Sequence, residues 1–196
     1  MDKDEIIKLH NNMSISEEYI PSPEKHMYNS RDKYHYDWSI RQFKENGVNT
    51  VLDIGCFDGW LDFLLIKEGF DVEGVELITS LSKAAERYAK LHGLKYKIHE
   101  GFFHELDIEK KYDAVVCYET LEHLPLELVP LYIQKMEGLT KGFIGISLPN
   151  QDHVYNKQHQ WTPNEDLIKS LIKRDFIIEY KEYPNIPGNW FISYKI

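Results

Sequence analysis

Two acidic residues and two glycines stand where they could hold a nucleotide-like molecule. Residues 51–59 read VLDIGCFDG, an apolar run followed by Asp53, Gly55 and Gly59. This pattern is typical of a buried strand that ends in a tight turn and opens a helix, whose first N–H groups face the space over the turn. A second apolar run ends at Glu76, where a carboxylate can accept hydrogen bonds from both hydroxyls of a ribose. We therefore predict a nucleotide-type pocket.

A second group of chemically active side chains follows a later apolar run. Glu119, Glu122 and His123 lie at i, i+3 and i+4, and they would share one face if this turn is helical. Three interpretations stay open. His123 is a general base, or the group is a structural hydrogen-bond network, or it binds a divalent metal together with His153 or His159.

Apolar spacing, Gly and Pro predict the elements that position these residues. Strands are expected near 50–55, 70–76, 94–100, 112–118, 143–148, 175–183 and 189–195, and helices near 30–46, 59–68, 79–92 and 126–138. Thr79 or Ser80 is expected to cap one helix, and Thr162 is expected to cap a last helix that begins at Pro163. This order predicts an α/β fold with a mostly parallel, doubly wound sheet and helices on both faces. Ligands of such sheets bind beyond the carboxyl ends of the strands.

Composition and charge narrow the classes of function. The chain has 196 residues, 42% of them hydrophobic, which suits one folded domain. A net charge of −9 without a Lys/Arg stripe disfavours nucleic acid as a partner. Cys56 and Cys117 form no metal motif, no signal peptide is visible, and no apolar run approaches the roughly 18 residues of a membrane span. We therefore expect a cytoplasmic protein with no membrane segment and no zinc site.

Five motifs, in this order, resemble those of class I S-adenosylmethionine-dependent methyltransferases. They are VLDIGCFDG, VEGVE, YDAVVCYETLEHL, GFIGISLPN and HQWTPNEDLIKSLIKRDF, and they cover nearly the whole chain after about residue 48. The resemblance implies a Rossmann-like, seven-stranded sheet with a final antiparallel strand. It also implies S-adenosyl-L-methionine as cofactor and methyl transfer to oxygen or nitrogen of a small acceptor.

Carried over position by position, the resemblance assigns most of the cofactor contacts. Asp53, Gly55 and Gly59 would lie under the methionine part, and Glu76 would hold the ribose. The turn after the third strand, residues 101–103, would flank the adenine.

Four aromatic or acidic positions complete this expected site. Phe102 stands where the family often has an acid, so the adenine would be held by stacking and backbone N–H groups. Phe57 would narrow the first turn and cover the cofactor. Tyr118 offers a π face to a sulfonium, and Glu119 is expected, with His123, to be a catalytic residue.

The N-terminal 30 residues are predicted to form an arm or lid on a methyltransferase domain of residues 31–196. The Tyr-rich segment 26–38, HMYNSRDKYHYDW, either packs as an amphipathic helix on the sheet or closes over the pocket as a lid. In the second case Tyr28, Arg31, Tyr34 or Tyr36 would touch the cofactor or the acceptor.

Two other functions remain as alternatives. The ETLEH motif is also similar to that of metal-dependent RNA 2′-O-methyltransferases, in which a second histidine precedes a Trp by four residues. Here His159 precedes Trp161 by two, so we expect no metal ion. A non-catalytic protein of the same fold that binds a nucleoside is the other alternative.

Overall fold

A seven-stranded sheet forms the centre of the computed structural model, which describes residues 3–10, 14–150 and 157–196. The strands lie in the order β3-β2-β1-β4-β5-β7-β6. β1 pairs in parallel with β2 and β4, β2 with β3 and β4 with β5, whereas β7 is antiparallel to both of its neighbours. Their bounds are β1 Thr50–Ile54, β2 Asp71–Glu76, β3 Lys97–Glu100, β4 Tyr112–Tyr118, β5 Thr140–Pro149, β6 Ile177–Tyr183 and β7 Ile186–Lys195. The predicted mostly parallel sheet with a final antiparallel strand is confirmed.

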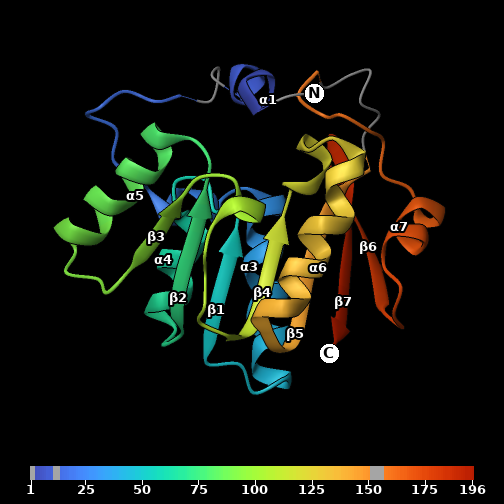
Figure 1. Ribbon diagram of the computed structural model, residues 1–196. Helices are drawn as coiled ribbons and strands as arrows, with labels where there is room; N and C mark the ends of the chain where they lie inside the picture. Colours follow the sequence, from blue (N-terminus) through green and yellow to red (C-terminus); the bar gives the residue numbers. More distant parts are fainter. Residues whose placement is uncertain (1–2, 11–13, 151–156) are drawn as a thin grey trace.

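Helices cover both faces of this sheet, as predicted (Figure 1). Buried side chains of α3 and α4 pack on one face, and those of α6 and α7 on the other. α5 lies beside α4, near β2 and β3. In the described residues the α-helices are α1 Lys3–His10, α2 Pro23–His26, α3 Ser30–Glu45, α4 Trp60–Lys67, α5 Thr79–Leu91, α6 Val129–Leu139 and α7 Glu165–Leu171. Their 3₁₀ turns are η2 Phe103–Glu105, η3 Leu121–His123 and η4 Leu126–Leu128.

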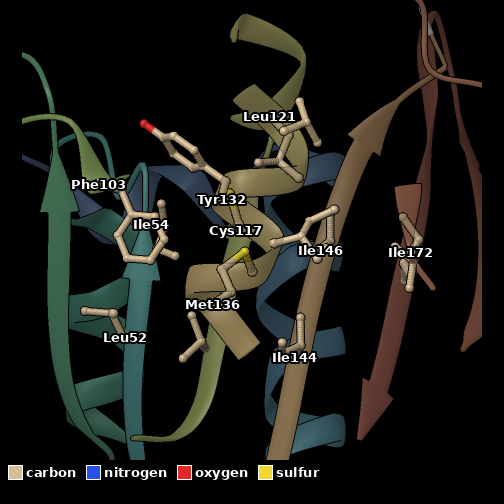
Figure 2. Packing of buried hydrophobic residues seen from close by; sticks show 14 of the residues in the cluster. Leu52, Ile54, Phe103, Cys117, Leu121, Tyr132, Met136, Ile144, Ile146 and Ile172 are labelled. Atoms are coloured by element: carbon tan, nitrogen blue, oxygen red, sulfur yellow. The ribbon is translucent and has the colours of Figure 1, made fainter. Parts of the chain in front are cut away.

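Successive side chains of a strand point to opposite faces of the sheet, so each strand contributes to the cores on both faces. Leu52 and Ile54 of β1 belong to the cluster under α6, while Val51, which precedes them, packs with α3 and α4 on the opposite face. Figure 2 shows Tyr132 and Met136 of α6 over this first cluster. Because both faces of β1 and β4 are covered, the middle of each strand is apolar. Polar side chains stand near the strand ends: Thr50 donates to Asp113 at 3.0 Å at the amino ends, and Asp53 reaches the cavity near the carboxyl end.

Two helix starts differ from the sequence prediction. α7 begins at Glu165, because the side-chain oxygen of Asn164 accepts a hydrogen bond from the N–H of Leu167 at 3.0 Å. Asn164, not Thr162, is therefore the cap. α5 has Ile78 as its N-cap residue and no side-chain cap, because the Thr79 hydroxyl donates instead to Glu100 at 2.7 Å.

Within the described part of the chain, no helix combines the length and the apolar composition needed to cross a membrane.

The cap of α7 gives a direct test of the fold. Asn164→Ala should lower the free energy of unfolding by about 1 kcal/mol, because the N–H of Leu167 loses its partner. Asn164→Asp should stay within a few tenths of a kcal/mol of the parent, since Asp caps equally well and its charge suits a helix N-terminus. Urea denaturation followed by circular dichroism measures both. Equal stability of the parent and the Ala variant would contradict this assignment.

Candidate functional site

A cavity of about 410 Å³ opens at the carboxyl ends of the parallel strands. Its walls come from the turns after four strands, represented by Gly55 (β1), Glu76 (β2), Gly101 (β3) and Glu119 (β4). Its size falls within the range of small-molecule sites. The predicted position of the pocket is therefore matched by a cavity to which all four turns contribute.

The turn after β1 has a backbone that depends on glycine. Gly55 has φ +78°, and a Cβ added there would lie 2.1 Å from Oγ1 of Thr120, in the turn after β4. Both Gly55 and Cys56 donate their N–H groups to the carbonyl of Val75, at 2.8 and 3.1 Å. Gly55 thus lets the ends of three neighbouring strands close on one another.

Glu76 ties this turn to the end of β2. One carboxylate oxygen accepts the N–H of Phe57 at 2.9 Å, and the other accepts that of Ile78 at 2.7 Å. Burial raises the pKa of Glu76 to about 7, against the opposing effect of these hydrogen bonds. A carboxylate has about four acceptor positions, so Glu76 keeps acceptor capacity for a hydroxyl group in the cavity that it lines.

Glu119 forms a second acidic position on the opposite side of the cavity. It has φ +49°, unusual for a non-glycine residue. Its Oε1 accepts hydrogen bonds from Ser147 at 3.1 Å and from the Asn189 amide, and its Oε2 lies 3.9 Å from Nη1 of Arg31. Desolvation raises the pKa of this carboxyl to about 7. The group is therefore poised to exchange a proton near neutral pH.

Ser147 connects Glu119 to a buried histidine. The serine hydroxyl lies 2.8 Å from Nε2 of His35, whose Nδ1 faces the carbonyl of Arg31 at 2.9 Å. Burial lowers the pKa of His35 to about 4, so the imidazole is neutral and carries a single N–H. His35 therefore fixes the start of α3 against β5.

Glu122 and His123 lie close to His159. The 3₁₀ turn η3 begins only at Leu121, so Glu119 does not share one helical face with the two residues that follow. One ligating atom from each of Glu122, His123 and His159 lies within 4.8 Å of the others, and the two imidazole rings are 5.0 Å apart. The sequence leaves a metal site with His153 or His159 open, although no ion is expected, and the structure brings together three side chains that are able to ligate one.

The backbone explains how His159 arrives there. The N–H of Gln160 donates to the carbonyl of Glu122 at 2.7 Å, and the indole N–H of Trp161 lies 3.2 Å from the carbonyls of both Leu121 and Leu124. Gln160 and Trp161, the two residues that follow His159, thus hold this loop against η3 by hydrogen bonds. His153 lies outside the described residues.

Most of the predicted cofactor-binding residues line the cavity, and two do not. Asp53, Gly55, Phe57, Glu76 and Tyr118 line it, as do the predicted catalytic residues Glu119 and His123.

Gly59 and Phe102 are absent from the lining of the described cavity. Gly59 instead begins α4 with φ +79°. Phe102 is buried, with its ring against His104, because it precedes the tight turn η2, and Gly101 and Phe103 line the cavity in its place.

Some residues at this site were missed by the sequence analysis. Ser147 and Asn189 hold Glu119, although they come from β5 and β7. A serine near the end of the apolar run GFIGISLP was a usable signal. Asn189 carried no such sequence signal, because its contact with Glu119 depends on the antiparallel pairing of β7 with β5.

The N-terminal residues pass over the cavity. α1 lies beyond the carboxyl ends of the strands (Figure 1), and Ile6 is 2% exposed and lines the cavity. Further along, the Tyr19 hydroxyl donates to Asp58 at 2.7 Å, and Arg87 donates to the carbonyl of Tyr19 at 3.0 Å. Tyr28, in contrast, is 91% exposed, so the expected ligand contact of this residue has no support in the structure.

The Tyr19 contact predicts a local effect of mutation. Tyr19→Phe removes the hydroxyl that holds residues 14–22 to the first turn, so amide hydrogen exchange in this segment should speed up while the strands keep their protection. Tyr28→Phe is the matched control, since its side chain is exposed. Unchanged exchange in Tyr19→Phe would show that the hydroxyl does not hold the segment.

The similarities of this chain to known proteins agree with the geometry. Residues 51–142, just under half of the chain, match the family described as "Methyltransferase domain". A ubiquinone biosynthesis O-methyltransferase of Rickettsia conorii is 36% identical over 74 residues, which are 38% of this chain and 26% of that protein. The chain thus spans about a quarter to a third of the length of the curated relatives it matches.

Solved structures share the fold at low identity. Magnesium protoporphyrin IX methyltransferase from Synechocystis PCC 6803, solved with bound SAH, has a TM-score of 0.70 and 16% identity, over 96% of this chain and 93% of that one. An S-adenosylmethionine-dependent methyltransferase from Clostridium acetobutylicum has a TM-score of 0.69 and 12% identity, over 97% and 98%. These similarities confirm the resemblance seen in the sequence, and the structures confirm the fold.

Proposed function

We propose that this chain, which has the fold and the central domain of class I S-adenosylmethionine-dependent methyltransferases, transfers a methyl group to an oxygen or nitrogen of a small acceptor. The observation that carries the proposal is the joint position of Asp53 and Glu76. Both acids stand at the ends of neighbouring parallel strands, on one cavity, with the turn of Gly55 between them.

The residues present suit S-adenosylmethionine as cofactor. Glu76 lines the cavity and keeps acceptor capacity beyond its bonds to Phe57 and Ile78, which suits the ribose hydroxyls. Asp53 suits the ammonium group of the methionine part, and Arg31 suits its carboxylate. Gly101 donates its N–H to the carbonyl of Glu76 and lines the same end of the cavity, where the adenine would lie.

Bound S-adenosylmethionine supplies an electrophilic methyl group on a sulfonium cation. The protein has to hold the acceptor atom in line with that methyl group and to exclude water. Such positioning contributes about 7–11 kcal/mol toward a barrier. The arm of residues 1–30, with Ile6 over the cavity, is proposed to serve this exclusion.

Glu119 is proposed to take the proton that the acceptor loses. Its Oε1 is occupied by Ser147 and Asn189, which leaves Oε2 toward the cavity and Arg31. A carboxyl group with a pKa of about 7 exchanges protons efficiently near neutral pH. His123 is proposed to assist from the other side of the cavity, where its Nε2 lies 3.8 Å from Glu122.

The class of acceptor is proposed from two supporting observations. The curated relatives are named as O-methyltransferases of ubiquinone biosynthesis, which favours oxygen of a small molecule. The net charge of −9 makes a polyanion a poor partner.

Two free, buried thiols support a reducing, cytoplasmic location.

Glu76→Ala should weaken S-adenosylmethionine binding by roughly 10- to 150-fold, because a hydrogen bond to a charged group contributes about 1.5–3 kcal/mol. Glu86→Ala is the control, since it removes one exposed negative charge of α5 away from the cavity. Isothermal titration calorimetry measures both affinities. Equal binding by parent and Glu76→Ala would remove the ribose assignment.

A separate observation favours a second candidate, methyl transfer that depends on a divalent ion. The carboxylate of Glu122 is 1% exposed, and an ionised group so deeply buried needs a partner charge or a proton. With the imidazoles of His123 and His159 it offers the mixed nitrogen and oxygen ligands that zinc and manganese accept.

The main proposal predicts that the protein needs no such ion. Its thermal unfolding temperature should be the same after dialysis against a chelator and after addition of manganese or zinc, because Glu122 then carries a proton instead. The same scan on His159→Ala is the control. A clear rise in unfolding temperature with metal in the parent, absent from His159→Ala, would assign the ion-dependent candidate.

A further inference from the structure

A buried pair of acids lies behind the cavity, and the proposed function uses only one of them. Asp53 ends β1 and lines the cavity, whereas Asp62 lies on α4 and is fully buried. Gly74 is the β2 residue paired with Asp53, and a Cβ added to Gly74 would lie 3.0 Å from Oδ2 of Asp62, so the two carboxyl groups act directly on each other. Oδ1 of Asp62 is buried and meets no N–H or O–H donor among the described residues. Two neighbouring carboxyl groups can form a hydrogen bond only if one of them carries a proton.

The surroundings of Asp62 are closely fitted to this carboxyl group. The Tyr96 hydroxyl donates to its Oδ2 at 2.6 Å and lies 3.4 Å from Sγ of Cys56. Gly74 of β2 leaves the space for them. A Cβ there would lie 2.2 Å from the Tyr96 hydroxyl, 2.6 Å from that sulfur and 3.0 Å from Oδ2. One oxygen of Asp62 is thus fixed as an acceptor, and the other is left for Asp53.

We propose that Asp62 is a positioning residue: it carries the proton of the pair on Oδ1, donates it to Asp53, and so keeps Asp53 an anion aimed at the cavity. That this anion receives the ammonium group of the cofactor rests on the proposed function. The state of the acid pair does not rest on it.

The position of the proton follows from the depth of the two groups. Burial raises the pKa of Asp53 to about 7 and the pKa of Asp62 well above its usual range, so the carboxyl nearer the cavity is the first to ionise. The titratable groups acting on the pair are all acids, phenols or thiols, namely Cys56, Asp58, Glu76, Tyr96, Cys117 and Tyr118. None of them supplies a positive charge.

The variant Asp62→Asn keeps a hydrogen-bond donor at position 62 but cannot carry a negative charge there. The amide N–H₂ of Asn can donate to Asp53 and its oxygen can accept from Tyr96, so it imitates the protonated acid. Asp62→Leu keeps a similar volume and offers no donor. The two variants differ in the one property that the proposal assigns to Asp62.

The first measurement needs no ligand and follows the free energy of unfolding from pH 5 to pH 8. In an unfolded chain the pKa of an Asp side chain is about 4, and in the folded state the pKa values of both acids are higher. The folded state therefore binds more protons than the unfolded state between pH 5 and pH 8. For this reason the free energy of unfolding falls as pH rises through this window. Asp62→Asn removes one coupled acid and should lose less stability than the parent over this range. Parallel profiles of parent and Asp62→Asn would overturn the proposal.

The second measurement is calorimetric titration with S-adenosylmethionine at pH 7, in two buffers that differ in ionisation heat. Asp62→Asn should bind within about 3-fold of the parent, and Asp62→Leu about 10-fold or more weakly. The parent should release more protons on binding than Asp62→Asn. If Asp62→Asn and Asp62→Leu weaken cofactor binding equally, the charge of Asp62 is what matters, and the proposal is wrong. If neither variant weakens binding, the role of Asp62 is structural, and the proposal is also wrong. If the parent binds nothing, the proposed function fails, while the pH profiles still decide the acid pair.

Discussion

The carboxylate of Glu76 holds together the two turns that shape the cavity. Its oxygens accept the N–H groups of Phe57 and Ile78, so the turn after β1 and the start of α5 meet at one side chain. Phe57 has φ +57°, a left-handed backbone that costs a non-glycine residue of order 1–2 kcal/mol. A buried, charge-assisted hydrogen bond can offset that cost. The cavity therefore has its shape before any ligand arrives.

The same region concentrates acids that are expensive to bury. The pKa values of Asp53, Glu76 and Glu119 are all raised to about 7 by desolvation. Such groups destabilise the folded protein near neutral pH unless protons or positive charges accompany them. A cationic ligand would relieve this cost, so instability at the site and affinity for a cation have one physical origin.

Local patterns predicted the fold well, and tertiary contacts explain the misses. The bounds of β4 were predicted because its apolar run ends at polar groups, and the turn of Gly55 was predicted from glycine spacing. The predicted cap of α7 was wrong by two residues, since Thr162 and Asn164, on either side of Pro163, both suit a cap. The sequence could not decide between His153 and His159 as the histidine that meets His123, because the hydrogen bond from the N–H of Gln160 to η3 is invisible in the sequence.

The central claim is that Glu76 and Asp53 together define a cofactor site, and a crystal structure of the complex with S-adenosylhomocysteine tests it most directly. The account predicts both ribose hydroxyls within hydrogen-bond distance of Glu76, with the amino group facing Asp53. It also predicts that the N–H bonds of Phe57 and Ile78 to Glu76 persist. A nucleoside bound elsewhere, or bound in the cavity without contact to Glu76, would contradict the account.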